Sequence, residues 1–224
     1  MKNIVKIKRA LISVSDKSLL ENLLPFLSEY KIEIISSGKT YKKIKKLGFK
    51  SIEISNFTGS NEMLGGRVKT LHPKIHAGIL NIRSNKNHRL DLIKNNFKEI
   101  DLIIVNFYPF ENVIKKNNNF KSIIENIDIG GPTLVRAAAK NFNDVLVITD
   151  PRNYIHVTNE INKYKGSTSL NFRKQMAINA FNEIANYDSI IANYFNDKFN
   201  VSFPNKKTFS GTLVENLRYG ENPH

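Results

Sequence analysis

Small polar and charged residues gather where short apolar runs of this sequence end. They include hydroxyls, a lysine, a carboxylate and glycines that begin helical patterns, and such groups can bind a phosphate monoester. The set is Ser13, Ser15, Lys17, Ser36, Ser37, Gly38, Thr40, Asn106, Tyr108, Asp128, Gly130 and Gly131. This set predicts a site for a phosphorylated small molecule.

A second candidate segment runs from Gly65 to Leu71 and reads GGRVKTL. Its two glycines allow close backbone approach, and Arg67, Lys69 and Thr70 follow within four residues. These residues could add cations and a hydroxyl to the phosphate site. A basic loop without a ligand fits the same residues.

Asp128 stands just before a predicted helix, where its carboxylate could cap the first turn. Pro132 suits that first turn, whose amides have no partner within the helix. Arg136 and Lys140 lie four residues apart on the same helix, and one of them could face the site.

Two other motifs do not support the chemistry they suggest. Ser37-Gly38-Lys39-Thr40 looks like the end of a P-loop, but Glu33 stands where that motif requires its first glycine. His72 and His76 are four residues apart, yet Pro73 argues against a helix there and no glutamate lies between them. We therefore expect neither an NTPase nor a metal site.

The elements needed to position these residues alternate between strands and helices. This order predicts an α/β fold with a doubly wound parallel sheet, helices on both faces and ligands at the carboxyl ends of the strands. Asp16 or Ser18 should cap the first helix, and the segment 56–80 should be irregular. The predicted strands are 9–14, 32–35, 50–54, 101–105 and 145–148, and the predicted helices begin near 18, 39, 120, 133, 153 and 170.

Composition excludes several classes of protein. The 224 residues hold 34 Lys and Arg against 20 Asp and Glu, a formal charge of +14, but the lysines are scattered and Asn and Ile are abundant too. We attribute most of this charge to an AT-rich genome and expect no nucleic-acid partner. Without cysteine there is no disulfide, thiolate or Cys nucleophile. No apolar run approaches the ~20 residues of a membrane span, and no signal peptide is evident, so we expect a cytoplasmic protein.

Several segments together resemble one family. They are RALISVSDKSLL at 9–20, IISSGKT at 34–40, MLGGRVKTLHPKIHAGIL at 63–80, VNFYPF at 105–110, ENIDIGGPTLVRAAAKN at 125–141 and LRYGENPH at 217–224. The chain resembles the N-terminal domain of the bifunctional purine-biosynthesis family, which joins an IMP cyclohydrolase to an AICAR formyltransferase. The resemblance implies a methylglyoxal-synthase-like fold and closure of formyl-AICAR to inosine monophosphate, with a small-molecule ribonucleotide as substrate and neither cofactor nor metal.

The resemblance also implies a role for each matching residue. Catalysis would fall to Lys69, Thr70, Tyr108, Asp128 and Lys140; the 5′-phosphate would be held by Ser15, Lys17, Ser37, Gly38 and Thr40; and the base or ribose would meet Arg67, Asn106, Gly130 and Gly131. One departure lies inside the phosphate turn, because Lys39 replaces the family's second glycine and could restrict the backbone.

The same resemblance suggests how the chain is organised. Residues 1–150 would form the α/β cyclohydrolase domain, 151–199 a helical extension of it, and 200–224 a linker and the start of the transformylase domain. A homodimer, if formed, would be weaker than in the longer family members. Three other functions stay open: a methylglyoxal synthase or related lyase, a nucleotide-binding regulatory module without catalysis, and a nucleic-acid binder.

Overall fold

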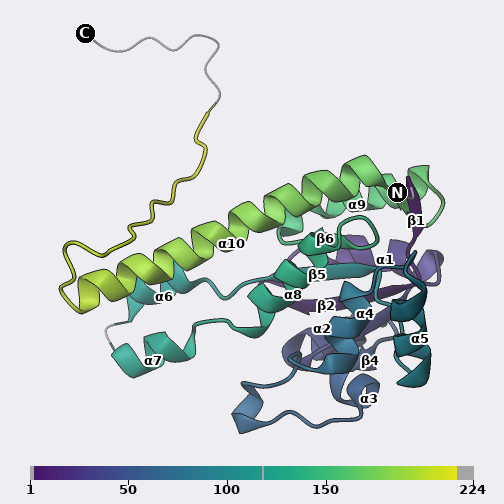
Figure 1. The fold of residues 1–224 in the computed structure, drawn as a ribbon, viewed down its shortest axis with the longest axis horizontal. Helices are drawn as coiled ribbons and strands as arrows, with labels where there is room; N and C mark the ends of the chain where they lie inside the picture. The colour runs from purple at the N-terminus through teal and green to yellow at the C-terminus, as the bar shows by residue number, and fades with distance from the viewer. Residues whose placement is uncertain (1–2, 118, 216–224) are drawn as a thin grey trace.

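A parallel sheet forms the centre of the molecule (Figure 1). The computed structural model describes residues 3–117 and 119–215. All neighbouring strands of the five-stranded sheet run parallel, in the order β4-β3-β2-β5-β6. The strands are β2 (Arg9–Val14), β3 (Glu33–Ser36), β4 (Ile52–Glu53), β5 (Leu102–Asn106) and β6 (Leu146–Ile148). The predicted parallel sheet is confirmed, although β4 is shorter than the predicted strand 50–54.

Helices cover both faces of this sheet, as predicted. On one face, α1 and α9 pack with Ala10 and Ile12 of β2, and on the other α4, α8 and α10 pack with Leu11. The central strands are therefore buried on both sides, which explains their continuous apolar runs. The helices are α1 (Leu20–Glu29), α2 (Gly38–Lys46), α3 (Ile54–Thr58), α4 (Pro73–Leu80), α5 (Lys86–Lys94), α6 (Phe110–Lys116), α7 (Phe120–Glu125), α8 (Gly130–Lys140), α9 (Tyr154–Lys163) and α10 (Leu170–Lys198), with short 3₁₀ turns η1 (Leu64–Gly66) and η2 (Pro151–Asn153).

The long helix α10 connects two parts of the molecule. Its first half packs on α8 and β6, and its second half extends past the sheet to α6 and α7 (Figure 1). At its start, β7 (Ser167–Ser169) pairs antiparallel with β1 (Ile4–Lys6). This two-stranded sheet was not predicted, because three-residue strands are too short to show an apolar alternation.

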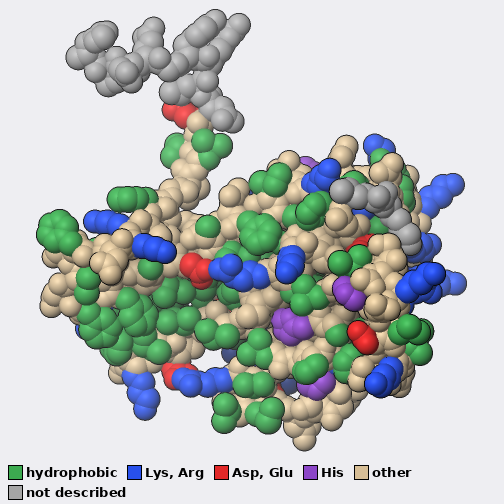
Figure 2. Space-filling model, in the orientation of Figure 1, with side chains coloured by type: hydrophobic (Ala, Val, Ile, Leu, Met, Phe, Trp, Pro, Cys, Tyr) green, Lys and Arg blue, Asp and Glu red, His purple; other side chains and the backbone are tan. Residues whose placement is uncertain are grey.

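Figure 2 shows Lys and Arg at several separate places on the visible face, rather than in one continuous area. In the described part of the chain, no helix is both long and apolar enough to cross a membrane.

The predicted cap of the first helix is wrong. Helix α1 begins at Leu20, and Leu19 occupies the N-cap position in a left-handed conformation without a side-chain cap. The Asp16 carboxylate instead accepts a hydrogen bond from the amide of Ser18. The polar residues before α1 therefore form a turn at the end of β2.

The prediction of an irregular segment over 56–80 is wrong in part, because α4 occupies its last third. Pro73 is the first residue of α4, a position where its missing N–H costs nothing. His72 precedes it, and its Nδ1 accepts a hydrogen bond from the amide of Lys74 at 3.1 Å. The proline that argued against a helix at this point starts one. Helices α5 and α6 were also not predicted.

Gly78 allows α4 to approach the segment before β5. A Cβ at Gly78 would lie 2.6 Å from the carbonyl oxygen of Lys98 and 3.3 Å from Cγ1 of Ile100. The amide of Ile100 donates to the carbonyl of Gly78 at 2.9 Å, so neither backbone can withdraw freely.

Gly78→Ala is therefore expected to destabilise the fold by about 1–3 kcal/mol, the usual cost of overpacking. Thermal unfolding followed by circular dichroism measures the effect. Gly211→Ala is the control, because a Cβ there meets open space. Equal melting temperatures for Gly78→Ala and the wild type would show that the close approach is not real.

Candidate functional site

Two strand ends and one helix start form a polar turn at the carboxyl edge of the sheet. The hydroxyls of Ser13 and Ser37 lie 2.9 Å apart, and the Thr40 hydroxyl contacts both the amide and the carbonyl of Val14 at 3.1 Å. Gly38 opens α2 with a positive φ of 47°, a conformation that favours glycine. The turn thus presents the N-terminus of α2, where an anion is favoured on physical grounds.

Lysines surround this turn. The Lys17 ammonium donates to the carbonyls of Val14 and Ser15 at 3.1 and 2.9 Å. Burial lowers the pKa of Lys17, the nearby charge of Lys39 lowers it further, and Asp16 acts in the opposite direction. Lys39 has a negative φ, so its replacement of a glycine does not strain the backbone. The turn gains a further cation from that replacement.

Lys69 reaches the same turn from the loop 65–71. Its Nζ lies 2.9 Å from Oε2 of Glu62 and 3.6 Å from the position of a Cβ on Gly38. A Cβ on Gly66 would lie 2.7 Å from Cε of Lys69. Gly38 and Gly66 therefore leave the space that the lysine side chain occupies. Of the two glycines expected to allow a close approach, Gly66 does so, whereas a Cβ on Gly65 would meet nothing within 4 Å.

Arg67 lies on the same loop but is held elsewhere. Its guanidinium forms two hydrogen bonds with the carboxylate of Glu125 at the end of α7, and both side chains are exposed. The Glu125 hydrogen bond is the main reason that the pKa of Arg67 rises above its usual value. A ligand that uses Arg67 would have to compete with Glu125.

Asp128 lies beside the start of α8. One of its carboxylate oxygens accepts from the amide of Gly131 at 2.9 Å. Burial raises the pKa of Asp128, while the amides of Gly131, Gly130 and Tyr108 act in the opposite direction. The carboxylate thus accepts from an amide in the first turn of α8, although Ile129 and not Asp128 holds the N-cap position. A carboxyl with a raised pKa is also suited to proton transfer.

Thr70 joins the loop to this helix start. Thr70 is buried, and its Oγ1 lies 2.7 Å from the position of a Cβ on Gly130. A side chain at Gly130 would therefore displace the Thr70 hydroxyl. The structure brings Lys69, Thr70 and Gly130 into one chain of contacts, with Asp128 at its end.

Asn106 closes the site at the end of β5. Its side-chain amide donates to the carbonyl of Asp16 at 2.9 Å and accepts from the amide of Asp16 at 2.8 Å. This pair of hydrogen bonds fixes the loop after β2, which carries Ser15 and Lys17. In this structure Asn106 therefore positions the loop that bears the predicted phosphate ligands.

Tyr108 and Lys140 differ in how they lie relative to the other candidates. The Tyr108 side chain is 46% exposed, but its backbone amide donates to the Asp128 carboxylate. Lys140 is exposed at the C-terminal end of α8. Ten residues of helix separate it from Gly130, about 15 Å at 1.5 Å per residue. The structure does not bring Lys140 to the other candidates, and its catalytic role stays a prediction.

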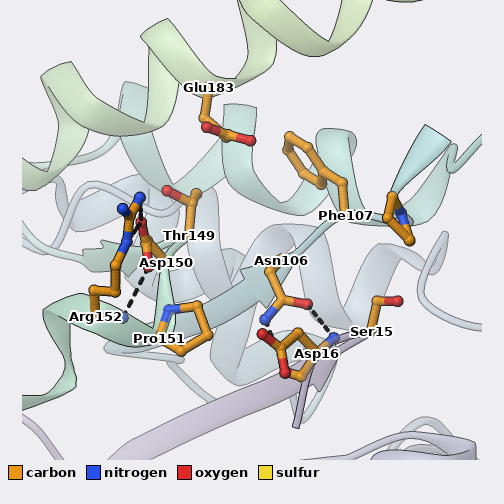
Figure 3. Close-up of a pocket in the computed structure, with 10 residues that line it drawn as sticks. Ser15, Asp16, Asn106, Phe107, Thr149, Asp150, Pro151, Arg152 and Glu183 are labelled. Carbon is orange, nitrogen blue, oxygen red and sulfur yellow. Dashed lines mark hydrogen bonds and ion pairs between the residues drawn. The ribbon is translucent and has the colours of Figure 1, made fainter. Parts of the chain in front are cut away.

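An open cavity of about 390 Å³ adjoins these residues (Figure 3). Its lining includes the predicted Ser15 and Asn106, and also Asp150, Arg152 and Glu183, which were not predicted. Arg152 pairs with Asp150. Partial burial would raise the pKa of Asp150, but the hydrogen bonds from Arg152 outweigh it and the pKa falls. Burial, followed by the charge of Asp150, raises the pKa of Glu183.

Asp150 and Glu183 were omitted for two different reasons. Asp150 lies two residues after the end of β6, so the strand-end criterion should have included it. Glu183 projects from α10, where no sequence signal marks it as part of a site. Among the described residues, no cluster of three His, Asp or Glu side chains could hold a metal ion.

Comparisons with known proteins show which family the chain belongs to. A model of the MGS-like domain matches residues 20–133, and a model of the AICARFT/IMPCHase bienzyme matches residues 138–224. A solved structure titled as that of ForH is 28% identical with a TM-score of 0.74, covering 84% of this chain and 99% of the other.

Curated relatives match almost the whole chain. The bifunctional purine biosynthesis protein PurH of Bradyrhizobium diazoefficiens is 45% identical over 219 residues, 98% of this chain and 41% of the relative. The PurH of Ruminiclostridium cellulolyticum is 47% identical over 220 residues, 97% of this chain and 43% of the relative. The chain thus spans about two fifths of the length of these relatives. With the MGS-like model matching half of its residues on a parallel α/β sheet of the expected kind, the chain belongs to the MGS-like domain family.

Proposed function

We propose that this chain is an IMP cyclohydrolase, which closes formyl-AICAR to inosine monophosphate. The observation that carries the proposal is the position of Lys69, whose ammonium lies against the phosphate turn at Gly38 while the next residue, Thr70, contacts Gly130. An anion site and a set of proton-transfer groups therefore adjoin each other. Relatives named as bifunctional purine biosynthesis proteins, similar over 97–98% of the chain, support the same activity.

The reaction forms one C–N bond and loses one molecule of water. The carboxamide nitrogen of the substrate attacks the carbon of the formamide, and the former formyl oxygen leaves as water after gaining two protons. The enzyme has to fold the substrate into an attacking geometry, stabilise the developing oxyanion and move protons. The described residues offer a suitable group for each of these tasks.

In this proposal Lys69 and Thr70 stabilise the formyl oxygen, and Asp128 transfers a proton beside them. Tyr108 and Lys140 complete the set implied by the resemblance. The phosphate is held by Ser15, Lys17, Ser37, Gly38 and Thr40, and the ribose and base by Arg67, Asn106, Gly130 and Gly131. Arg67 exchanges Glu125 for the substrate when the nucleotide binds.

The direct test is to mix the purified protein with formyl-AICAR and to follow the ultraviolet absorbance of inosine monophosphate. We expect turnover without added folate and in the presence of a metal chelator. Tight nucleotide binding without turnover would favour a regulatory module, and formation of methylglyoxal from dihydroxyacetone phosphate would favour a lyase. Either result would refute the proposed activity.

A further inference from the structure

Tyr187 on α10 contacts the backbone of the candidate acid–base residue. The amide of Asp128 donates to the Tyr187 hydroxyl at 2.8 Å, and Tyr187 is 5% exposed. Asp128 lies in the turn between α7 and α8, so its amide has no place in a helical hydrogen-bond pattern. An amide that lacks a partner away from water is costly, and the Tyr187 hydroxyl supplies the partner of this partly buried amide.

The ring of Tyr187 contacts a second segment of the site. Its centroid lies 4.9 Å from that of Phe107, which stands between Asn106 and Tyr108. Phe107 in turn lies 3.1 Å from the position of a Cβ on Gly131. A single side chain of α10 thus supports both the end of β5 and the start of α8.

A second contact links α10 with α8, but it is too weak to replace the contact made by Tyr187. Asp188, the next residue of α10, pairs with Arg136 of α8, and both side chains are about half exposed. Exposed ion pairs contribute little to stability, on the order of 0–1 kcal/mol. The buried Tyr187 contact is therefore the one that can fix the turn.

The hydroxyl remains protonated at neutral pH. Burial raises the pKa of Tyr187 to about 12, and the nearby Asp128 carboxylate contributes to the rise, although the hydrogen bond from the Asp128 amide opposes it. A neutral phenol can accept from the amide without placing a second negative charge beside the Asp128 carboxylate.

We propose that Tyr187 is a positioning residue, which holds the turn 126–131 so that the Asp128 carboxyl and the amides of Gly130 and Gly131 keep their places in the site. The consequence for turnover rests on the proposed cyclohydrolase activity. Tyr187 acts through Asp128 and does not itself contact the reacting atoms.

Tyr187→Phe tests this proposal, because it removes the acceptor oxygen and keeps the ring. We expect kcat for formyl-AICAR to fall about tenfold while KM changes less than twofold, since small displacements of a reacting group reduce the rate more than binding. Tyr194→Phe is the matched control: Tyr194 lies two helical turns further along α10 and also packs against Phe110. Its kcat should equal that of the wild type.

Amide hydrogen exchange gives a second readout that does not depend on activity. In the wild type, the Asp128 amide should exchange at least tenfold more slowly than an unprotected amide. In Tyr187→Phe this protection should fall, and in Tyr194→Phe it should persist. Melting curves for both variants confirm that each is folded at the assay temperature.

Wild-type kcat in a folded Tyr187→Phe variant would overturn the proposal. The proposal would also be overturned if the Asp128 amide of the wild-type protein exchanged as fast as an unprotected amide. This second outcome does not depend on whether the variant folds. If the wild type itself does not turn over formyl-AICAR, the cyclohydrolase assignment fails, and the exchange experiment still decides whether Tyr187 fixes the turn.

Discussion

Replacing Lys69 by alanine is expected to lower the turnover of formyl-AICAR by about 10³-fold, within the usual range for a group that stabilises charge and transfers protons. The Lys69 ammonium lies between Glu62 and the turn at Gly38, and it is a cation suited to meet an oxyanion formed there. Thr70, the next residue, could not substitute for it, because its side chain is buried against Gly130.

The same substitution should leave the fold intact. The ion pair between Lys69 and Glu62 is partly exposed, 33% and 59% for the two side chains, and such pairs contribute little to stability. Lys74→Ala is the matched control, because Lys74 lies five residues further on, above the ring of Phe57. Single-turnover kinetics with both variants measure the catalytic role of Lys69, and melting curves measure any contribution of Lys69 to stability. A Lys69→Ala enzyme within tenfold of the wild type would remove Lys69 from the mechanism.

Asp128→Asn is expected to reduce turnover by at least about 10²-fold, the lower range for loss of a general acid or base. Asparagine keeps an oxygen that can accept from the amide of Gly131, so the start of α8 should be preserved. The variant loses the ability to exchange a proton.

The same variant should become relatively more stable as the pH rises. Burial raises the pKa of Asp128, so the folded protein binds this proton more tightly than the unfolded chain does. Below the unfolded pKa, near 3.9, both states are protonated and the carboxyl has no electrostatic cost. As the pH rises through the folded pKa, the buried carboxylate ionises and the wild type loses stability from this group. Asparagine has no such loss.

Melting temperatures measured between pH 4 and pH 8 test whether the wild type loses stability relative to the variant as the pH rises. The difference between Asp128→Asn and the wild type should move in favour of the variant with increasing pH. The exposed Asp188 provides the control substitution, Asp188→Asn, which should show no such gain. A wild type that gains stability over the variant as the pH rises would contradict the direction of the shift.

The sheet and most of its helices could be predicted because buried parallel strands leave a simple pattern. Runs such as 102–105 are apolar on both faces and stop at a polar residue, and the structure places β5 there. Elements without such an apolar pattern were harder to recognise. Pro73 was interpreted as a helix breaker although it starts α4, and β1 and β7 are held together by a long-range pairing that sequence spacing does not reveal.

The candidate site likewise contains residues that the sequence could predict and residues that it could not. Strand ends and small residues predicted that Ser13, Ser37 and Thr40 gather at one edge of the sheet, because this depends on backbone geometry that small residues signal directly. The approach of Lys69 to Gly38 was not predicted, and the binding of phosphate there stays a prediction. Tyr187 and Glu183 could not be found, since they reach the site only through the packing of α10. Lys140 shows the opposite limitation: a motif residue on α8 can lie a helix length from the motif residues at its start.

The packing of α8, β6 and α10 determines where this protein can be divided. The two matching family models meet between residues 133 and 138, inside α8. A fragment ending there would lack the edge strand β6, the helices α9 and α10 and the partner of β1. Split reporters, gene fission or domain exchange at that boundary would therefore produce halves that expose apolar sheet and fold only on reassembly. The unit that evolution or an engineer can move as one piece extends at least from β1 to the end of α10.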